Sequence, residues 1–290
     1  MSEPRTIQYV RKSSPTLEGA GVHLKRAFAD DLSRRLDPFL LLDDFHSNDP
    51  MDYVAGFPWH PHRGIETVTY MINGDVEHGD SMGNRGTISS GDVQWMTAGG
   101  GIIHQEMPQR LNGFFQGFQL WVNLPSGSKM MNPRYRGVTQ KEIKTATPAK
   151  GVNIKVIAGN VGKVEGPVGD LVVNADYVDI HLKPNSEWEH PVKPGHTAFA
   201  YVFEGEGSFG GAGKSDVDAE TLVVFGSGDS VVSRAGNKGM RFLLVSGEPI
   251  GEPIAWRGPI VMNTWDEIEV AFQEYWAGTF LKQSRPAGTL

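Results

Sequence analysis

Two short motifs in the first half of the sequence could bring metal-binding side chains to one point. His60 and His62 form a His-x-His pair, and a His-x-Glu pair, His104 and Glu106, follows about forty residues later. Side chains on an extended segment alternate between two faces, so each pair would point to one side of its strand. Two neighbouring strands that carry such pairs could direct four ligands at a single ion.

The ligand types indicate which ions such a site would bind. Three imidazoles and a carboxylate suit a divalent first-row metal such as Fe(II), Mn, Ni, Cu or Zn. Calcium and magnesium prefer oxygen ligands. The sequence contains no cysteine, which excludes thiolate nucleophiles, zinc fingers and cysteine-ligated iron–sulfur clusters. Four ligands would leave one or two octahedral positions open for a substrate or O₂.

Glu66 is a fifth candidate ligand. It follows His62 by four residues and has the same parity as both histidines of the first pair. Three roles are open for it: a metal ligand, a partner that orients a histidine, or a buried acid paired elsewhere. An isolated histidine is more often an ordinary surface or core residue. The combination of two pairs, with the glycine run 99–101 just before the second, favours a metal site.

The elements that must position these residues are predicted to be strands. From about Thr6 to Asp266, short runs rich in β-branched and aromatic residues alternate with Gly, Asn, Asp and Pro. Glycine makes up about 12% of the chain, 36 of 290 residues, against a usual share of about 7%. Many tight turns between short strands are typical of an all-β sandwich or barrel.

One amphipathic helix is predicted near the C-terminus. Thr264 is a suitable N-cap, and Glu267 is placed to complete a capping box. Apolar residues then recur at three- to four-residue spacing, and we expect this face to pack on a sheet. These residues are Ile268, Phe272, Tyr275, Trp276 and Phe280.

An internal repeat indicates two similar β-domains. Residues 64–74 can be laid over 195–205, and residues 91–99 over 228–236, in the same order along the chain. We therefore predict domains at 1–135 and 136–290, with the helix in the second.

The same alignment predicts that the two domains differ in metal binding. The second copy has residues at the four ligand positions that could not form the same site, so one metal ion per chain is expected. These residues are Pro191, Lys193, Arg241 and Leu243.

Composition excludes some classes of protein. Lys and Arg number 27 against 34 Asp and Glu, a formal net charge of −7, whereas nucleic-acid binding normally needs a basic surface. No stretch approaches the ~18 consecutive apolar residues of a membrane helix. The first fifteen residues lack the apolar core of a secretory signal. We therefore expect a cytoplasmic protein, or a nuclear one in a eukaryote, that binds neither nucleic acid nor membrane.

Several motifs together resemble the pirin family of the cupin superfamily. The resemblance covers essentially the whole chain, and its motifs are at 37–41, 60–68, 91–99, 104–108, 120–124 and 258–264. It implies two jelly-roll-like cupin barrels packed face to face, with one iron in the N-terminal domain. Family usage implies that the ligands are His60, His62, His104 and Glu106. It favours Glu106 over Glu66 as the carboxylate ligand. Glu66 would then lie next to the ligands without binding the metal itself.

The resemblance implies two possible functions. Some pirins are similar to quercetin 2,3-dioxygenases, which open a flavonol ring with O₂; Glu106 would then be the base that takes the flavonol proton. Others are iron-dependent regulators that bind a transcription factor or a metabolic enzyme. An enzyme would need an apolar pocket for a planar aromatic substrate. Candidate pocket residues are Phe57, Trp59, Met71, Trp95, Phe118 and Trp121.

Overall fold

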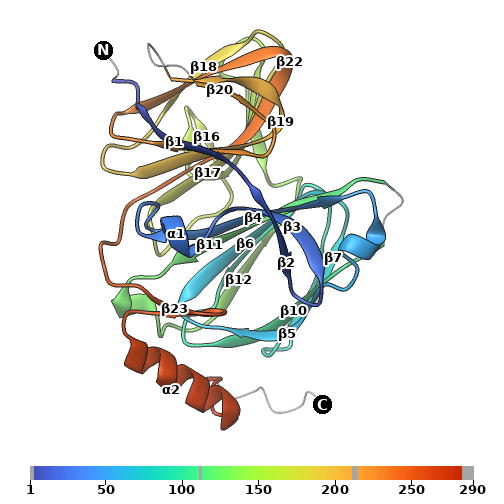
Figure 1. The fold of residues 1–290 in the computed structure, drawn as a ribbon, viewed down its shortest axis with the longest axis vertical. Helices are drawn as coiled ribbons and strands as arrows, with labels where there is room; N and C mark the ends of the chain where they lie inside the picture. Colours follow the sequence, from blue (N-terminus) through green and yellow to red (C-terminus); the bar gives the residue numbers. More distant parts are fainter. Residues whose placement is uncertain (1–2, 111–112, 211–214, 283–290) are drawn as a thin grey trace. The chain divides into compact units, whose positions relative to one another are not determined.

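The chain is built mostly of antiparallel strands (Figure 1). A computed structural model describes residues 3–110, 113–210 and 215–282. The chain divides into two compact units, each formed from separate segments. Unit 1 comprises Met1–Ser14, Arg35–Pro38 and Lys141–Pro249, and unit 2 comprises Pro15–Arg34, Phe39–Gln140 and Ile250–Leu290. The division therefore differs from two continuous domains at 1–135 and 136–290. Residues 1–14 belong to the unit formed mainly by 141–249, and residues 250–290 belong to the unit formed mainly by 39–140.

Unit 2 contains both predicted ligand pairs and has two main sheets within the described residues. Its large sheet has the strand order β12-β9-β6-β11-β4-β3-β2, and its small sheet the order β5-β10-β7-β8. The large sheet consists of β2 (Ser14–Glu18), β3 (Val22–Phe28), β4 (Phe39–Ser47), β6 (Ile65–Asn73), β9 (Val93–Thr97), β11 (Phe115–Asn123) and β12 (Arg134–Val138). The small sheet consists of β5 (Phe57–His62), β7 (Val76–Asp80), β8 (Arg85–Ile88) and β10 (Ile102–Pro108).

Unit 1 has one principal sheet in the described part of the chain. Its order is β1-β21-β19-β22-β17-β14-β13, with β18 added to β22 and β20 added to β19. The strands are β1 (Ile7–Lys12), β13 (Lys144–Ala146), β14 (Val152–Ala158), β17 (Ala175–Leu182), β18 (Glu187–Pro191), β19 (Thr197–Phe209), β20 (Ser215–Asp218), β21 (Thr221–Phe225) and β22 (Ser230–Gly247). A small hairpin is formed by β15 (Asn160–Val161) and β16 (Val164–Glu165).

Strand pairing corrects part of the repeat alignment. In unit 2, β9 pairs with β6; in unit 1, β21 pairs with β19. The counterpart of β9 is therefore β21, not residues 228–236. In the same way, β10 pairs with β5 in unit 2, and residues 230–234 of β22 pair with β18 in unit 1. The counterpart of β10 is therefore the first part of β22. Arg241 and Leu243 lie in the later part of β22, which pairs with β17, so they are not the counterparts of His104 and Glu106.

The predicted C-terminal helix is α2 (Trp265–Trp276), and its capping box is present. Thr264 Oγ1 accepts a hydrogen bond from the Glu267 amide, and the Glu267 side chain accepts one from the Thr264 amide. The buried face is narrower than predicted, because Trp276 is 69% exposed and Phe280 lies beyond the helix. The helix packs on the hairpin of β23 (Ala255–Arg257) and β24 (Ile260–Met262), next to which it lies in Figure 1.

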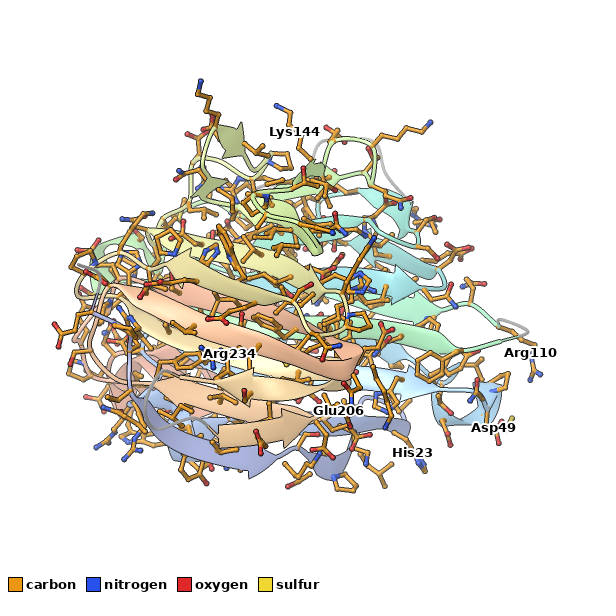
Figure 2. All side chains as sticks on the ribbon, turned by 90° about the horizontal axis from the view of Figure 1, so that it is seen from above. His23, Asp49, Arg110, Lys144, Glu206 and Arg234 are labelled. Carbon is orange, nitrogen blue, oxygen red and sulfur yellow. The ribbon has the colours of Figure 1, made fainter. Side chains whose placement is uncertain are left out.

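The remaining helical segments of the described residues are short. They are α1 (Asp30–Ser33) and the 3₁₀ turns Pro50–Asp52 and Ser126–Ser128. Across the described ranges, no helix is long and apolar enough to cross a bilayer. The side chains of Asp49, Arg110 and Lys144 project outward from the ribbon (Figure 2). Apolar residues instead form separate cores, such as the Val22, Phe45 and Phe115 cluster of unit 2.

Candidate metal centre

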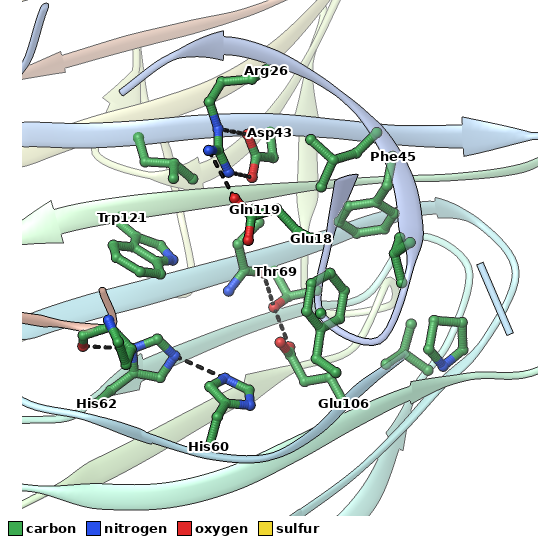
Figure 3. Close-up of a pocket in the computed structure, with 18 of the residues that line it drawn as sticks. Glu18, Arg26, Asp43, Phe45, His60, His62, Thr69, Glu106, Gln119 and Trp121 are labelled. Carbon is green, nitrogen blue, oxygen red and sulfur yellow. Dashed lines mark hydrogen bonds and ion pairs between the residues drawn. The ribbon is translucent and has the colours of Figure 1, made fainter. Parts of the chain in front are cut away.

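Pairing between β5 and β10 brings three histidines together. His60 lies opposite His104, and His62 lies opposite Ile102 two residues earlier, so all three rings project from the same face of the small sheet. One ring nitrogen from each lies within 4.8 Å of the others. The ring centroids of His60 and His104 are 4.4 Å apart, and those of His62 and His104 are 5.0 Å apart. Figure 3 shows His60 and His62 at one side of a cavity.

Two backbone carbonyls orient the first pair. The Nδ1 atom of His60 lies 2.8 Å from the Pro58 carbonyl oxygen, and that of His62 lies 3.1 Å from the carbonyl oxygen of Pro259. A proton on each Nδ1 satisfies these carbonyls and leaves both Nε2 lone pairs to face each other at 3.0 Å. The Pro259 contact comes from the C-terminal segment of unit 2.

The third histidine has ring nitrogens that lack a protein partner. Both nitrogens of His104 are buried and make no hydrogen bond to any described residue. Burial lowers the pKa of His62 and His104 well below the usual value, and the neighbouring imidazoles lower it further. The rings are therefore neutral at pH 7, which is the form that binds metal ions. Converging neutral nitrogens without partners fit a bound cation.

Glu106 projects into the same cavity but is not part of the histidine cluster. Its Oε1 accepts a hydrogen bond of 2.8 Å from Thr69 Oγ1, whose oxygen is 2.7 Å from the Gln119 amide. A threonine hydroxyl has one proton, so the Gln119 NH₂ group must face Thr69 when Thr69 donates to Glu106. Burial raises the pKa of Glu106 to about 7, partly opposed by the Thr69 hydrogen bond. The carboxylate is thus held beside the histidines by the large sheet.

Glu66 lies elsewhere. It is fully buried and accepts hydrogen bonds from Trp95 Nε1 at 2.9 Å and Thr97 Oγ1 at 2.5 Å. Thr69 faces the cavity, so Glu66, three residues earlier on β6, belongs to the opposite face of the large sheet. The parity prediction is wrong because the chain passes from one sheet to the other at Gly64, where φ is +79°. Of the three roles left open, the structure supports a buried acid paired elsewhere.

A cavity of about 500 Å³ in unit 2 adjoins the histidines. This volume is within the range of small-molecule sites, about 300–1,000 Å³. Its apolar walls include Phe45 and Phe115 from the large sheet and Trp256 from the C-terminal segment. His62 packs edge-on against Trp121, with ring centroids 5.1 Å apart.

Two of the six predicted pocket residues, Phe57 and Trp121, line this cavity. The other four do not. Trp59 is 49% exposed, and Met71 packs in the adjoining core. Trp95 donates to Glu66 on the far face of the large sheet. Phe118 lies one position before cavity-lining Gln119, so by parity it also faces away.

The sequence reasoning missed a charged group in the cavity wall. Arg26 makes a bidentate ion pair with Asp43, at 2.8 and 2.7 Å, and a further ion pair with Glu18 at 2.9 Å. Asp43 is only 5% exposed. The available signal was the carboxylate pair Asp43-Asp44 within the otherwise apolar run 39–45, because a buried charge needs a partner.

Comparisons with known proteins agree with this architecture. Residues 21–122 match the Pirin family model, and residues 177–281 match that of the Pirin C-terminal cupin domain. The chain is 45% identical over 262 residues to Pirin-1 of Arabidopsis thaliana, covering 89% of this chain and 88% of that protein. It is 40% identical over 283 residues to a Pseudomonas aeruginosa protein named "Putative quercetin 2,3-dioxygenase", covering 95% and 98%.

A solved structure shares the fold over nearly the full length. Quercetin 2,3-dioxygenase from Acinetobacter baumannii superposes with a TM-score of 0.88 at 33% identity, covering 96% of this chain and 99% of that one. The two family models and the similarity over the whole chain agree with the observed strand pairing. The chain therefore belongs to the pirin family of two-domain cupin proteins.

Proposed function

We propose that unit 2 is a metal-dependent dioxygenase centre that opens the ring of a flavonol-type substrate with O₂. The observation that carries this proposal is the convergence of three neutral imidazoles on one edge of an apolar-walled cavity. The names of the Pseudomonas relative and the Acinetobacter structure support the same chemistry. The resident metal is proposed to be Fe(II), held by His60, His62 and His104, with Glu106 as the fourth ligand.

The donor set fits such an ion. His104 has two buried nitrogens without a partner among the described residues, and the Nε2 atoms of His60 and His62 face each other. When bound, the metal would act as a Lewis acid towards a substrate oxygen and towards O₂. Unit 1 offers no comparable group. Among the described residues, the one cluster of His, Asp or Glu side chains close enough to hold a metal ion lies in unit 2. One metal ion per chain is therefore expected.

The protein side chains have separate roles in this proposal. Glu106 takes the proton of the flavonol hydroxyl, because its carboxylate lines the same cavity as His60 and His62. Thr69 positions that carboxylate through its 2.8 Å hydrogen bond. Trp121 and Phe57 provide flat apolar surface for the rings and exclude water from them.

Metal analysis combined with oxygen uptake tests the proposal. The iron-loaded protein should hold one iron per chain and consume O₂ with quercetin. His104→Ala should lose both properties. His181→Ala is the matched control, because His181 is an exposed histidine of unit 1 and should retain both. Two metal ions per chain, or turnover by a metal-free His104→Ala variant, would contradict the assignment. Full iron loading without turnover of any flavonol would instead support the regulatory role.

A further inference from the structure

A charged cluster in the cavity wall has no role in the chemistry proposed above. Glu18, Arg26 and Asp43 come from β2, β3 and β4, adjacent strands of the large sheet, and all three line the cavity. Figure 3 shows Arg26 and Asp43 on the side of the cavity away from His60 and His62. We call these three residues the carboxylate–arginine cluster.

Stability does not account for the cluster. A buried ion pair contributes little compared with well-packed apolar residues of similar volume, because removing its charges from water is costly. Burial of Asp43 raises the pKa of its carboxyl to about 6, although the hydrogen bonds from Arg26 lower it. Placing two carboxylates and a guanidinium on the inner face of a cavity is therefore better explained by a ligand.

The chemistry of the cluster indicates the ligand class. Two carboxylates face one guanidinium, so a ligand carboxylate or phosphate would meet a net negative charge. A hydroxyl group can donate to a carboxylate and accept from a guanidinium. Glu18 is accessible for this role, with 41% of its side chain exposed, and Arg26 has 23% exposed. Two hydroxyls on neighbouring carbon atoms could use both residues at once.

We infer that the carboxylate–arginine cluster selects substrates whose far ring carries adjacent hydroxyl groups, with one hydroxyl donating to Glu18 and its neighbour accepting from Arg26. The inference rests on the proposed function for the orientation of the substrate, with its reacting ring at the histidines. The apolar walls between the two ends, including Phe57 and Trp121, hold the planar body of the molecule.

Binding of three flavonols tests the inference without turnover. Quercetin has two adjacent hydroxyls on its pendant ring, kaempferol has one, and galangin has none. Tryptophan fluorescence of the zinc-loaded protein would measure their affinities, since zinc has no redox chemistry. Quercetin should bind about ten- to a hundredfold more tightly than galangin, the worth of two hydrogen bonds, with kaempferol between them.

Two variants assign the preference to the cluster. Glu18→Ala and Arg26→Met should each lower the ratio of quercetin to galangin affinity, and the two together should bring it close to one, while galangin binding stays unchanged. Glu187→Ala is the matched control, because Glu187 forms an exposed pair with Arg234 in unit 1 and should leave the ratio at its wild-type value. Glu18 is partly exposed, so its variant should fold even if Arg26→Met does not.

The outcomes separate this inference from the proposed function. A quercetin to galangin ratio near one in the wild-type protein, the full wild-type ratio retained by Glu18→Ala, or no flavonol binding would overturn the inference. A ratio retained by the Glu18 variant would mean that the adjacent hydroxyls bind near the histidines instead. A cluster-dependent ratio without oxygen uptake would support the inference and refute the dioxygenase. Oxygen uptake with equal kcat/KM for quercetin and galangin, together with equal affinities, would refute the inference alone.

Discussion

Arg63 links the candidate metal centre to the C-terminal segment, and replacing it should lower the free energy of unfolding. The side chain is 2% exposed and follows His62 directly. Its Nε donates to the Gly100 carbonyl at 2.8 Å, and its Nη2 donates to the Phe280 carbonyl at 2.9 Å. Nη2 also forms a 2.8 Å ion pair with Glu274. The guanidinium carbon lies 4.3 Å from the centre of the Phe280 ring.

We predict that Arg63→Met lowers the free energy of unfolding by about 3–7 kcal/mol. Methionine retains most of the apolar contact, so the loss comes from the polar groups. Each of the two buried carbonyls loses its partner at a cost of about 1–3 kcal/mol. Glu274 is 24% exposed and keeps its ion pair with Lys282, so the lost pair with Arg63 adds about 1 kcal/mol. Such a loss is a large part of a typical domain stability of about 5–15 kcal/mol.

Urea unfolding of the metal-free protein, followed by tryptophan fluorescence, would measure this loss. The matched control is Arg257→Met, because Arg257 forms an exposed pair with Glu269 on α2 and should cost less than about 1 kcal/mol. Metal affinity of the Arg63 variant should fall about tenfold or more, since Gly100 leads into the strand that carries His104. A loss below about 1 kcal/mol with unchanged metal affinity would refute the reasoning.

Three further variations should give distinct results. Between pH 7 and 5, the free energy of unfolding of the metal-free protein should fall more than that of a metal-free His104→Leu variant. His104 has a folded-state pKa well below the unfolded value, so its stabilising effect is present above pH 6.5 and lost on acidification. Unfolding curves of both proteins across this range check the sign, and an equal change in the two would contradict it. Glu66→Gln should cost about 1–3 kcal/mol yet keep one metal ion per chain by metal analysis. Gly64→Ala should lower the thermal midpoint, since its φ is +79° and a Cβ would lie 1.9 Å from the Val261 carbonyl oxygen; an unchanged midpoint would show that the turn relaxes easily.

The sequence predicted best what depends on alternation within one strand. His60 and His62 share a face of β5, and His104 and Glu106 share a face of β10, as period two requires. The capping box of α2 was equally predictable, because it involves only residues 264–267. Glu66 was misplaced because its parity was carried through Gly64, where the chain leaves one sheet and enters another. Periodicity contains no information about such a crossing.

The cavity wall could be predicted less well for the same reason. Trp95 and Phe118 were suitable residue types, yet which face of the large sheet points to the histidines is decided by packing between sheets. The division into units is still less visible in the sequence. Residues 1–14 join unit 1 through the pairing of β1 with β21, a contact between segments more than two hundred residues apart.

The C-terminal segment therefore has a role that its distance from the ligand motifs conceals. The Pro259 carbonyl holds the His62 ring with Nε2 towards the other histidines, and Glu274 and Phe280 hold the neighbouring Arg63. Trp256 and Pro259 also form part of the cavity wall. Because α2 and the β23–β24 hairpin pack together, one small apolar cluster positions these contacts. A candidate metal centre whose proposed ligands all lie before residue 107 is consequently completed by residues after 250. A chain ending at the predicted boundary near 135 would lack both the Pro259 contact to His62 and the contacts that hold Arg63.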